Sequence, residues 1–456
     1  MIDKYYNGVI EQVVSGIGNV EHNSILVRYS NDFSIWDLES VNHYKDQSDI
    51  FFTCHEFSYN KIAEAYEPYL GLIRQMFHRY CSGTLEEFME ECDVYKLQRP
   101  VFESYFEKGF CERTEQILID EVEYEQERMR NSIVTMLQKL SEIRPVVIVL
   151  NRFQLASKST MQLSNSLLQV KNKNIGIVLG VNDVQSIPEF AHEEWDAICE
   201  SMDDRNMVYH IGNAGRNMEP DVMDYYSDYE SDDGYRKLNN LVYFLDFDQA
   251  DHHLSKIERR IKFDNFTISE KKHYQLLLLQ IMVSVLQRDI AKALESCEDL
   301  EKLQDQEKEG AFYYNFWMAT SYMYLGKLEE AMIYVQKAKE CGEALGDDFL
   351  VFRAELLKAQ NQMSGWCNIF FCAQDIEISD KLIEKLNAYH YKNHLAHIYI
   401  YAYDNKPEIV AKAYRSEAFL IYFSKGVALA KEIGNEQLIS CLLYTSDAAD
   451  EARSVD

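Results

Sequence analysis

Three histidines in the last quarter of the sequence could bind a metal. His394 and His397 are three residues apart, so a helix would place them on one face, and His390 lies nearby. The adjacent pair His252–His253 would point to two different faces of a helix. A metal site also needs a further ligand in the right geometry, which the spacing does not provide. We therefore interpret these residues as surface or packing histidines, with metal binding as the alternative.

Cysteines and carboxylates give no stronger signal for chemistry. The ten cysteines contain no Cys-x-x-Cys pair, so they predict reduced thiols rather than a zinc site. The acidic segment 219–233 lacks the Asp/Asn/Gly spacing of a calcium loop, and the acidic residues 120–127 are interpreted as a solvated helix face. No Gly-x-Ser-x-Gly motif is present. The sequence thus predicts no catalytic residue, no metal and no cofactor.

Composition and charge narrow the classes of partner. The chain has 456 residues, of which 47% are apolar, and a formal net charge of −29. Such an acidic surface repels phosphate backbones, which argues against a nucleic-acid-binding protein. The first residues do not form a signal peptide, and the longest apolar runs are too short to span a membrane. We expect a cytoplasmic protein with more than one domain and no membrane contact.

The first half of the chain alternates short apolar runs with helical patterns. The runs that predict strands are 24–29, 50–54, 146–150, 175–181 and 207–211. They are apolar without alternation, which is typical of parallel strands that helices cover on both faces. Helices are predicted at 62–80, 85–92, 121–143 and 159–169. This order predicts an α/β domain with a parallel sheet.

The second half is predicted to be almost entirely helical, with an internal repeat. Ala250, Ala293 and Ala331 each begin a similar helix, and a spacing of this kind indicates stacked helical hairpins. Around Ala331 the pattern resembles the tetratricopeptide repeat, in which small residues stand where helices approach closely. Gly346 and Gly434 are predicted to end helices, because glycine adopts the left-handed conformation of a C-cap.

The first half resembles the ATPase domain of the STAND class, the signal-transduction ATPases related to AAA proteins. The resemblance lies in the strand–helix order and in Arg144–Ser159 (RPVVIVLNRFQLASKS), which is similar to the Walker B segment of that family. The following run, NKNIGIVLGVND, is similar to the strand that carries the family's sensor residue. The resemblance implies a P-loop NTPase-like parallel sheet.

The residues that would perform nucleotide chemistry differ from the family pattern. No G-x-x-x-x-G-K-[ST] occurs in the chain. The loop after the first strand, where Walker A would stand, instead contains Ser30, Asn31, Asp32, Phe33 and Ser34. Asn151 and Arg152 stand where the family has the Walker B acids, and Ser157 replaces a later acid. Carboxylates at these positions bind magnesium and orient the attacking water. We therefore expect a degenerate module without nucleotide hydrolysis, and the chain as given not to be an enzyme.

These patterns predict four segments. Residues 1–218 are the degenerate α/β domain, 219–236 an acidic linker, 237–440 the tetratricopeptide-like repeats, and 441–456 an artefactual tail. The string CLLYTSDAADE at 441–451 resembles the translation of a sequencing-library adapter. We therefore expect the natural chain to continue beyond Ser440.

The combined resemblance implies the regulatory portion of a bacterial signalling protein. Its repeats would bind a protein or peptide partner and control a missing C-terminal output domain, either a GGDEF-type diguanylate cyclase or a helix-turn-helix domain. Two alternatives remain: an active but divergent ATP-binding STAND ATPase, and a stand-alone repeat scaffold.

Overall fold

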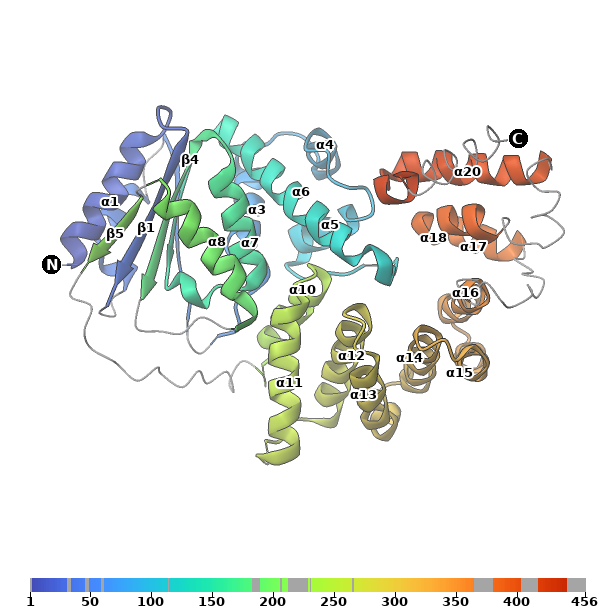
Figure 1. The fold of residues 1–456 in the computed structure, drawn as a ribbon. Coiled ribbons are helices and arrows are strands. Elements are labelled where there is room, and N and C mark those ends of the chain that lie inside the picture. Colours follow the sequence, from blue (N-terminus) through green and yellow to red (C-terminus); the bar gives the residue numbers. More distant parts are fainter. Residues whose placement is uncertain are drawn as a thin grey trace, which may run out of the picture. The chain divides into compact units, whose positions relative to one another are not determined.

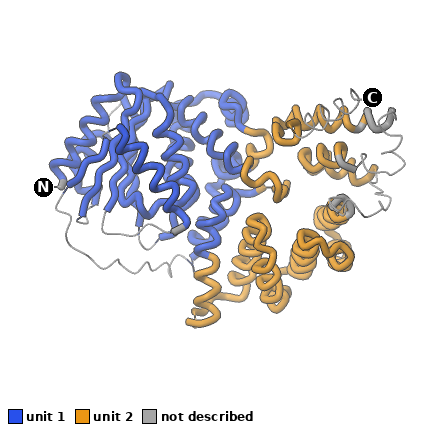
Figure 2. The backbone as a smooth tube through the Cα atoms, in the orientation of Figure 1, with its two compact units in different colours: residues 1–94, 101–112, 125–253 blue, residues 95–100, 113–124, 254–456 orange. Residues whose placement is uncertain are grey.

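The computed structural model describes most of residues 2–440, which form two compact units (Figure 2). Unit 1 comprises residues 1–94, 101–112 and 125–253, and unit 2 comprises residues 95–100, 113–124 and 254–456. The residues that are not described are 1, 31–33, 46–48, 59–60, 114, 183–188, 206, 212–228, 230, 265, 365–379, 403–416 and 441–456. The expected artefactual tail therefore lies outside the described residues.

Unit 1 contains a five-stranded parallel sheet with the order β2-β3-β4-β1-β5 (Figure 1). The strands are β1 (His22–Tyr29), β2 (Phe51–Glu56), β3 (Val146–Asn151), β4 (Asn172–Asn182) and β5 (Val208–Ile211). Each of the five apolar runs overlaps one strand, and all residues of β3 are buried. The prediction of a parallel α/β sheet followed by helical repeats is confirmed.

Helices cover both faces of this sheet (Figure 1). The N-terminal helix α1 (Ile2–Gly16), which the sequence did not lead us to predict, lies on one face and contacts β1, β3 and β4. Its residues Tyr6, Ile10 and Val13 have no exposed surface and join one apolar cluster with the strands. The other helices of this region are α2 (Glu39–Tyr44), α3 (Tyr69–Tyr80), α4 (Leu85–Glu91), α5 (Arg99–Lys108), α6 (Val122–Ile143), α7 (Lys158–Gln169) and α8 (His192–Asp203).

Two predicted boundaries are wrong. The helix predicted at 62–80 begins only at Tyr69, because Pro68 has no backbone N–H and disfavours helical geometry in the preceding residue. The last residues of the predicted linker, 232–236, belong to α10 (Asp232–Tyr243). Ser231 starts that helix early by accepting a hydrogen bond from the backbone N–H of Gly234 at 2.8 Å.

Helical hairpins make up most of unit 2. They follow α11 (Phe247–Phe263), which runs from one unit into the other. The helices are α12 (Glu270–Leu286), α13 (Ile290–Leu303), α14 (Gly310–Tyr324), α15 (Leu328–Leu345), α16 (Asp348–Ser364), α17 (Asp380–Ala388), α18 (Lys392–His397) and α20 (Glu417–Ile433). Neighbouring helices of the series from α12 to α16 pack on each other.

Small residues lie where these helices approach closely, as the repeat pattern predicts. Ala293, Ala319 and Ala331 are completely buried in one apolar cluster. Gly346 ends α15 with a φ of 65°, and Gly434 has a φ of 75° after α20, so both adopt the predicted left-handed conformation. Among the described residues, no helix is long and apolar enough to cross a membrane.

Close helix packing makes the alanine positions intolerant of larger side chains. We expect Ala331→Leu to lower the free energy of unfolding by about 1–3 kcal/mol, because the site has no room for the added atoms. Ala344→Leu is the matched control, since Ala344 lies on the same helix but is exposed. Urea unfolding followed by circular dichroism measures both variants. Equal effects of the two substitutions would contradict the packing described here.

Candidate functional site

The order of the strands identifies one edge of the sheet as the place to look for a site. After β1 the chain passes to β2 on one side, whereas after β4 it passes to β5 on the other side. Open parallel sheets bind ligands outside the carboxyl ends of neighbouring strands whose connections leave in opposite directions. β1 and β4 are such a pair here. The candidate site is therefore the carboxyl edge of the sheet, which includes the ends of β1, β2, β3 and β4.

Part of the loop after β1 is described. Asn31, Asp32 and Phe33 lie outside the described residues, whereas Ser30 directly follows the strand and Ser34 begins a short 3₁₀ helix. The Ser34 hydroxyl donates a hydrogen bond to Glu56 Oε2 at 3.0 Å, and the Ile35 backbone N–H donates to the same oxygen at 3.1 Å. A carboxylate of the protein therefore accepts hydrogen bonds from this loop.

Asn151 lies at the end of β3, inside the carboxyl edge, and has no exposed surface. Its Oδ1 accepts a hydrogen bond from the Tyr29 hydroxyl at the end of β1, at 2.8 Å. On β4, Gly180 leaves room for this arrangement: a Cβ there would lie 2.7 Å from Asn151 Oδ1 and would collide with the Tyr6 hydroxyl. The side chains of Tyr6, Tyr29 and Asn151 thus fill the interior of this edge.

The chemistry of Tyr6 fits a packing role. Burial raises the pKa of its hydroxyl well above the ordinary value, and nearby Tyr29, Cys54 and Glu56 raise it further. The hydroxyl therefore stays neutral at physiological pH. A neutral phenol in an enclosed position is not a general base.

Arg152, the second residue expected at the Walker B position, forms an ion pair. It adopts the left-handed conformation, with a φ of 53°, and its Nη1 lies 3.0 Å from Glu56 Oε1. Both side chains are mostly buried, with exposed fractions of 18% and 10%. Glu56 therefore accepts hydrogen bonds from Ser34 and Ile35 and pairs with Arg152. The sequence reasoning missed Glu56, although its position two residues after the predicted strand 50–54 could have suggested it.

The N-terminus of α7, close to the same edge, is also occupied by the protein itself. Ser157 caps the helix, and its hydroxyl donates to the Glu64 carbonyl at 2.9 Å. The Ser159 backbone N–H donates to Asp246 Oδ2 at 2.8 Å. Burial raises the pKa of Asp246, while the hydrogen bonds from Ser159 lower it. A helix N-terminus attracts anions, and here Asp246 supplies one from within the chain.

His55, near the end of β2, and Glu67 form a half-buried pair. His55 Nε2 lies 3.5 Å from Glu67 Oε1. Burial lowers the pKa of His55 to about 4, which the charge of Glu56 opposes, and burial raises the pKa of Glu67. Both shifts favour the neutral forms. A pair of this kind could exchange a proton.

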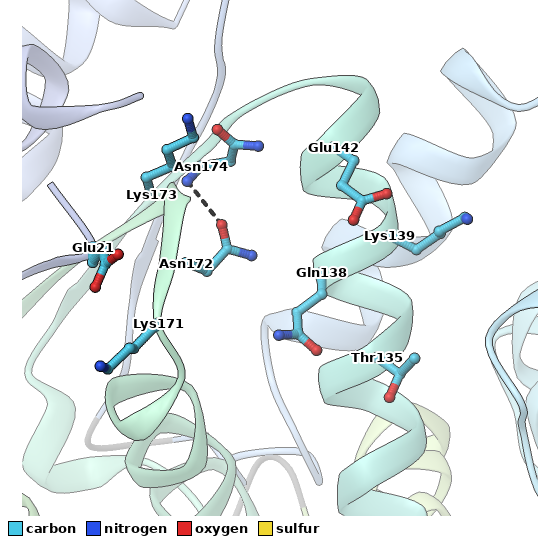
Figure 3. Close-up of a pocket in the computed structure, with 9 residues that line it drawn as sticks. All are labelled: Glu21, Thr135, Gln138, Lys139, Glu142, Lys171, Asn172, Lys173 and Asn174. Atoms are coloured by element: carbon cyan, nitrogen blue, oxygen red, sulfur yellow. Dashed lines mark hydrogen bonds between the residues drawn. The ribbon is translucent and has the colours of Figure 1, made fainter. Parts of the chain in front are cut away.

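A shallow groove of about 570 Å³ lies at the opposite, amino edge of the sheet (Figure 3). Lys171, Asn172 and Asn174 line it on the β4 side, and Gln138, Lys139 and Glu142 on the α6 side. Asn172 Oδ1 accepts a hydrogen bond from the Asn174 backbone N–H at 2.8 Å. Ligands of open parallel sheets bind at the carboxyl edge instead, so this groove is not the candidate site.

The structure places the histidines singled out in the sequence in three environments. His253 is buried beside the Tyr229 hydroxyl, and His390 lies in a turn with a φ of 61°. His394 and His397 lie on α18 and each face a glutamate. The interpretation of these two as surface or packing histidines therefore missed their carboxylate partners. Among the described residues, no group of three His, Cys, Asp or Glu side chains is arranged to hold a metal ion.

Comparisons with known proteins give one match. No protein-family model and no curated protein matches the chain. The chain is similar to a solved structure from Pyrococcus horikoshii, described as a STAND protein with a tetratricopeptide repeat sensor. The two chains are 12% identical with a TM-score of 0.38, and the match covers 94% of this chain and 77% of that one. At these values the likeness does not assign a role to any residue of the candidate site.

One expectation is corrected by this comparison. From the altered Walker residues we expected that the chain, as given, is not an enzyme. The solved structure to which it is similar is described as a Signal Transduction ATPase. We therefore withdraw that expectation.

The close packing at Gly180 leads to a prediction. We expect Gly180→Ala to lower the free energy of unfolding by about 1–3 kcal/mol, because the new Cβ would displace Tyr6 and Asn151. Gly8→Ala is the control: a Cβ there meets nothing within 4 Å, and alanine favours a helix by about 1 kcal/mol over glycine. Thermal and urea unfolding measure both. If Gly180→Ala were as stable as the wild type, the edge would not be closed as described.

Burial of His55 predicts a pH dependence of stability. The unfolded chain takes up the proton as the pH falls through about 6.5, whereas folded His55 takes it up only near pH 4. Stability should therefore fall between these two pH values, by on the order of 2 kcal/mol. We expect His55→Gln to reduce this loss, and exposed His43→Gln to leave it in place. Urea midpoints measured from pH 7 to pH 4 test this, and an unchanged slope in His55→Gln would refute it.

Proposed function

We propose that the chain is part of a signalling regulator in which unit 2 binds a protein or peptide. The observation that carries the proposal is the series of packed hairpins α12–α16, because stacked helical repeats offer an extended surface to a partner. Apolar side chains remain exposed on α14, on α15 and in the turn between them: Tyr324, Leu325, Ile333 and Leu345. Exposed apolar groups of this kind contribute to binding when a partner removes them from water.

Lysines and tyrosines on the same hairpin add to this surface. Lys327 Nζ lies 5.6 Å from the centre of the Tyr322 ring, and Lys337 Nζ lies 5.0 Å from that of Tyr334. The two tyrosine rings stack at 5.5 Å. Stacked rings beside cations favour a partner that combines apolar and acidic groups.

Site-specific photocrosslinking in the native host tests the proposed partner surface. A benzoyl-phenylalanine at Ile333, whose exposed fraction is 57%, should crosslink to one defined protein. The same probe at Tyr5 of α1, with an exposed fraction of 60%, is the control in unit 1. We expect a crosslinked species from position 333 and none from position 5. Equal labelling from both positions, or none from 333, would reject the proposal.

A second candidate function is that of an active, divergent ATP-binding regulator. The observation that favours it is the carboxylate of Glu56 at the carboxyl edge, next to the loop and to Arg152. An acid at such an edge is the group that a magnesium–nucleotide complex needs. The similarity to a protein described as an ATPase gives a reason to test it. The hypothesis that hydrolysis has been lost rests on Asn151 and Arg152 in place of two acids.

Calorimetric titration with ATP and Mg²⁺ distinguishes these possibilities. If Glu56 holds a magnesium–nucleotide complex, micromolar binding should weaken by roughly tenfold or more in Glu56→Gln. Release of inorganic phosphate, measured on the same sample, separates binding from hydrolysis. Binding that is unchanged in Glu56→Gln would exclude this carboxylate as the ligand. The matched control is Glu39→Gln, an exposed acid in the first turn of α2.

An output domain beyond Ser440 completes the proposed regulator. The resemblance to bacterial signalling proteins supports either a GGDEF-type diguanylate cyclase or a helix-turn-helix domain. Reading the genomic DNA beyond codon 440 tests this. An open reading frame with either domain would support the proposal, whereas an immediate stop codon would reject it in favour of a stand-alone scaffold.

A further inference from the structure

A short segment far from the repeats in the sequence belongs to unit 2 (Figure 2). Residues 115–124, named here the latch segment, precede and begin α6, yet they pack with helices that follow them by more than 250 residues. Ile119 and Val122 of the segment are buried. Its other buried residues include two acids, Glu115 and Glu121, so the docking of the segment is polar as well as apolar.

Glu121 has three polar contacts with α18 and with the residues after α20. His397 Nε2 lies 3.0 Å from its Oε1, and Asn435 Nδ2 donates to the same oxygen at 2.8 Å. Asn393 Nδ2 donates to Oε2 at 2.6 Å, and its Oδ1 accepts a hydrogen bond from Asn435. Burial alone would raise the pKa of Glu121, but the hydrogen bonds from His397, Asn435 and Asn393 lower it to about 2. The carboxylate is therefore charged across the physiological range.

Glu115 makes a second, shorter contact one turn away on α18. Its Oε1 lies 2.7 Å from His394 Nδ1 and accepts a hydrogen bond from the His394 backbone N–H at 2.9 Å. The exposed fractions of the two side chains are 8% and 2%. Within the described part of the chain, Glu115 Oε2 and His394 Nε2 have no hydrogen-bond partner. Closing this contact therefore removes two polar atoms from water without replacing their hydrogen bonds.

This combination makes the docked segment specific but reversible. Two glutamates six residues apart in the chain meet two histidines one helical turn apart, which fixes the register of docking. Buried charges gain from their partners but lose their hydration, and at Glu121 the partners outweigh burial because its pKa falls to about 2. Unpaired Glu115 Oε2 and His394 Nε2 shift the balance towards release. When the segment leaves, water can hydrate every one of these groups.

We infer that residues 115–124 form a releasable latch on α18 and on the segment that follows α20. In the closed state Glu115 and Glu121 are bound by His394, His397, Asn393 and Asn435. In the open state the segment is hydrated and the first turn of α6 is released with it. The latch thereby makes the beginning of α6 responsive to the state of the last helices of unit 2. The inference holds whether or not unit 2 binds a partner.

Hydrogen–deuterium exchange of the full chain tests the latch. Glu121→Gln keeps the shape of the side chain but removes its charge and presents an amide N–H₂ to neighbouring donors. We expect the amides of residues 115–124 and of α18 to exchange roughly tenfold faster, with α14 and α15 unchanged. His397→Gln removes the imidazole from the same contact at a position with an exposed fraction of 21%, and should act in the same direction if Glu121→Gln fails to fold.

Glu123→Gln is the matched control, because Glu123 lies in the same segment but its side chain is exposed. It should leave the exchange of the latch segment unchanged. A double variant, Glu121→Gln with His397→Gln, should accelerate exchange no more than the larger single effect, because both remove one contact. Equal acceleration throughout unit 2 would show that these residues belong to a single cooperative core, and no acceleration would show that they do not hold the segment. Either result would overturn the latch.

Discussion

The hydrogen bond between Tyr29 and Asn151 determines what the carboxyl edge of the sheet can hold. It joins the ends of β1 and β3 across β4, and the Asn151 side chain is completely buried. Buried polar groups must be paired, and here the pairing occurs within the chain. Gly180 is required on the intervening strand, because any side chain there would collide with Tyr6 and Asn151. The consequence is an edge whose interior is filled by protein atoms.

Polar groups around the Tyr29–Asn151 hydrogen bond are also paired within the chain. Glu56 is bound by Ser34, Ile35 and Arg152, and Asp246 by the N-terminus of α7. Charged groups that would attract a ligand in another parallel sheet have partners from the chain. Glu56 is the carboxylate that a ligand would have to compete for, and its exposed fraction is only 10%.

Much of the fold could be predicted from local patterns. Uninterrupted apolar runs such as Val146–Leu150 mark strands because helices cover both faces of the sheet, and buried alanines such as Ala331 mark close helix contacts. Asn151 and Arg152 could be located because they follow such a run directly. Gly180 also carried a signal, since a glycine within an apolar strand indicates a close approach of another group.

Other features could not be predicted because they depend on distant pairs. The contact between Glu121 and His397 joins residues 276 positions apart, and the sequence around neither residue predicts its partner. The acidic residues around Glu121 therefore suggested only a solvated helix face. Helix α1 was missed for a related reason. Its residues Tyr6, Ile10 and Val13 are buried only because they pack on the sheet.

The closed carboxyl edge can be tested by a double-mutant cycle on Tyr29 and Asn151. Tyr29→Phe, Asn151→Ala and the double variant would be compared by urea unfolding of the full chain. If the two side chains are hydrogen-bonded in the buried edge, their coupling energy should be about 1 kcal/mol or more. A coupling energy near zero would mean that the two residues act independently and that the edge is open to other ligands.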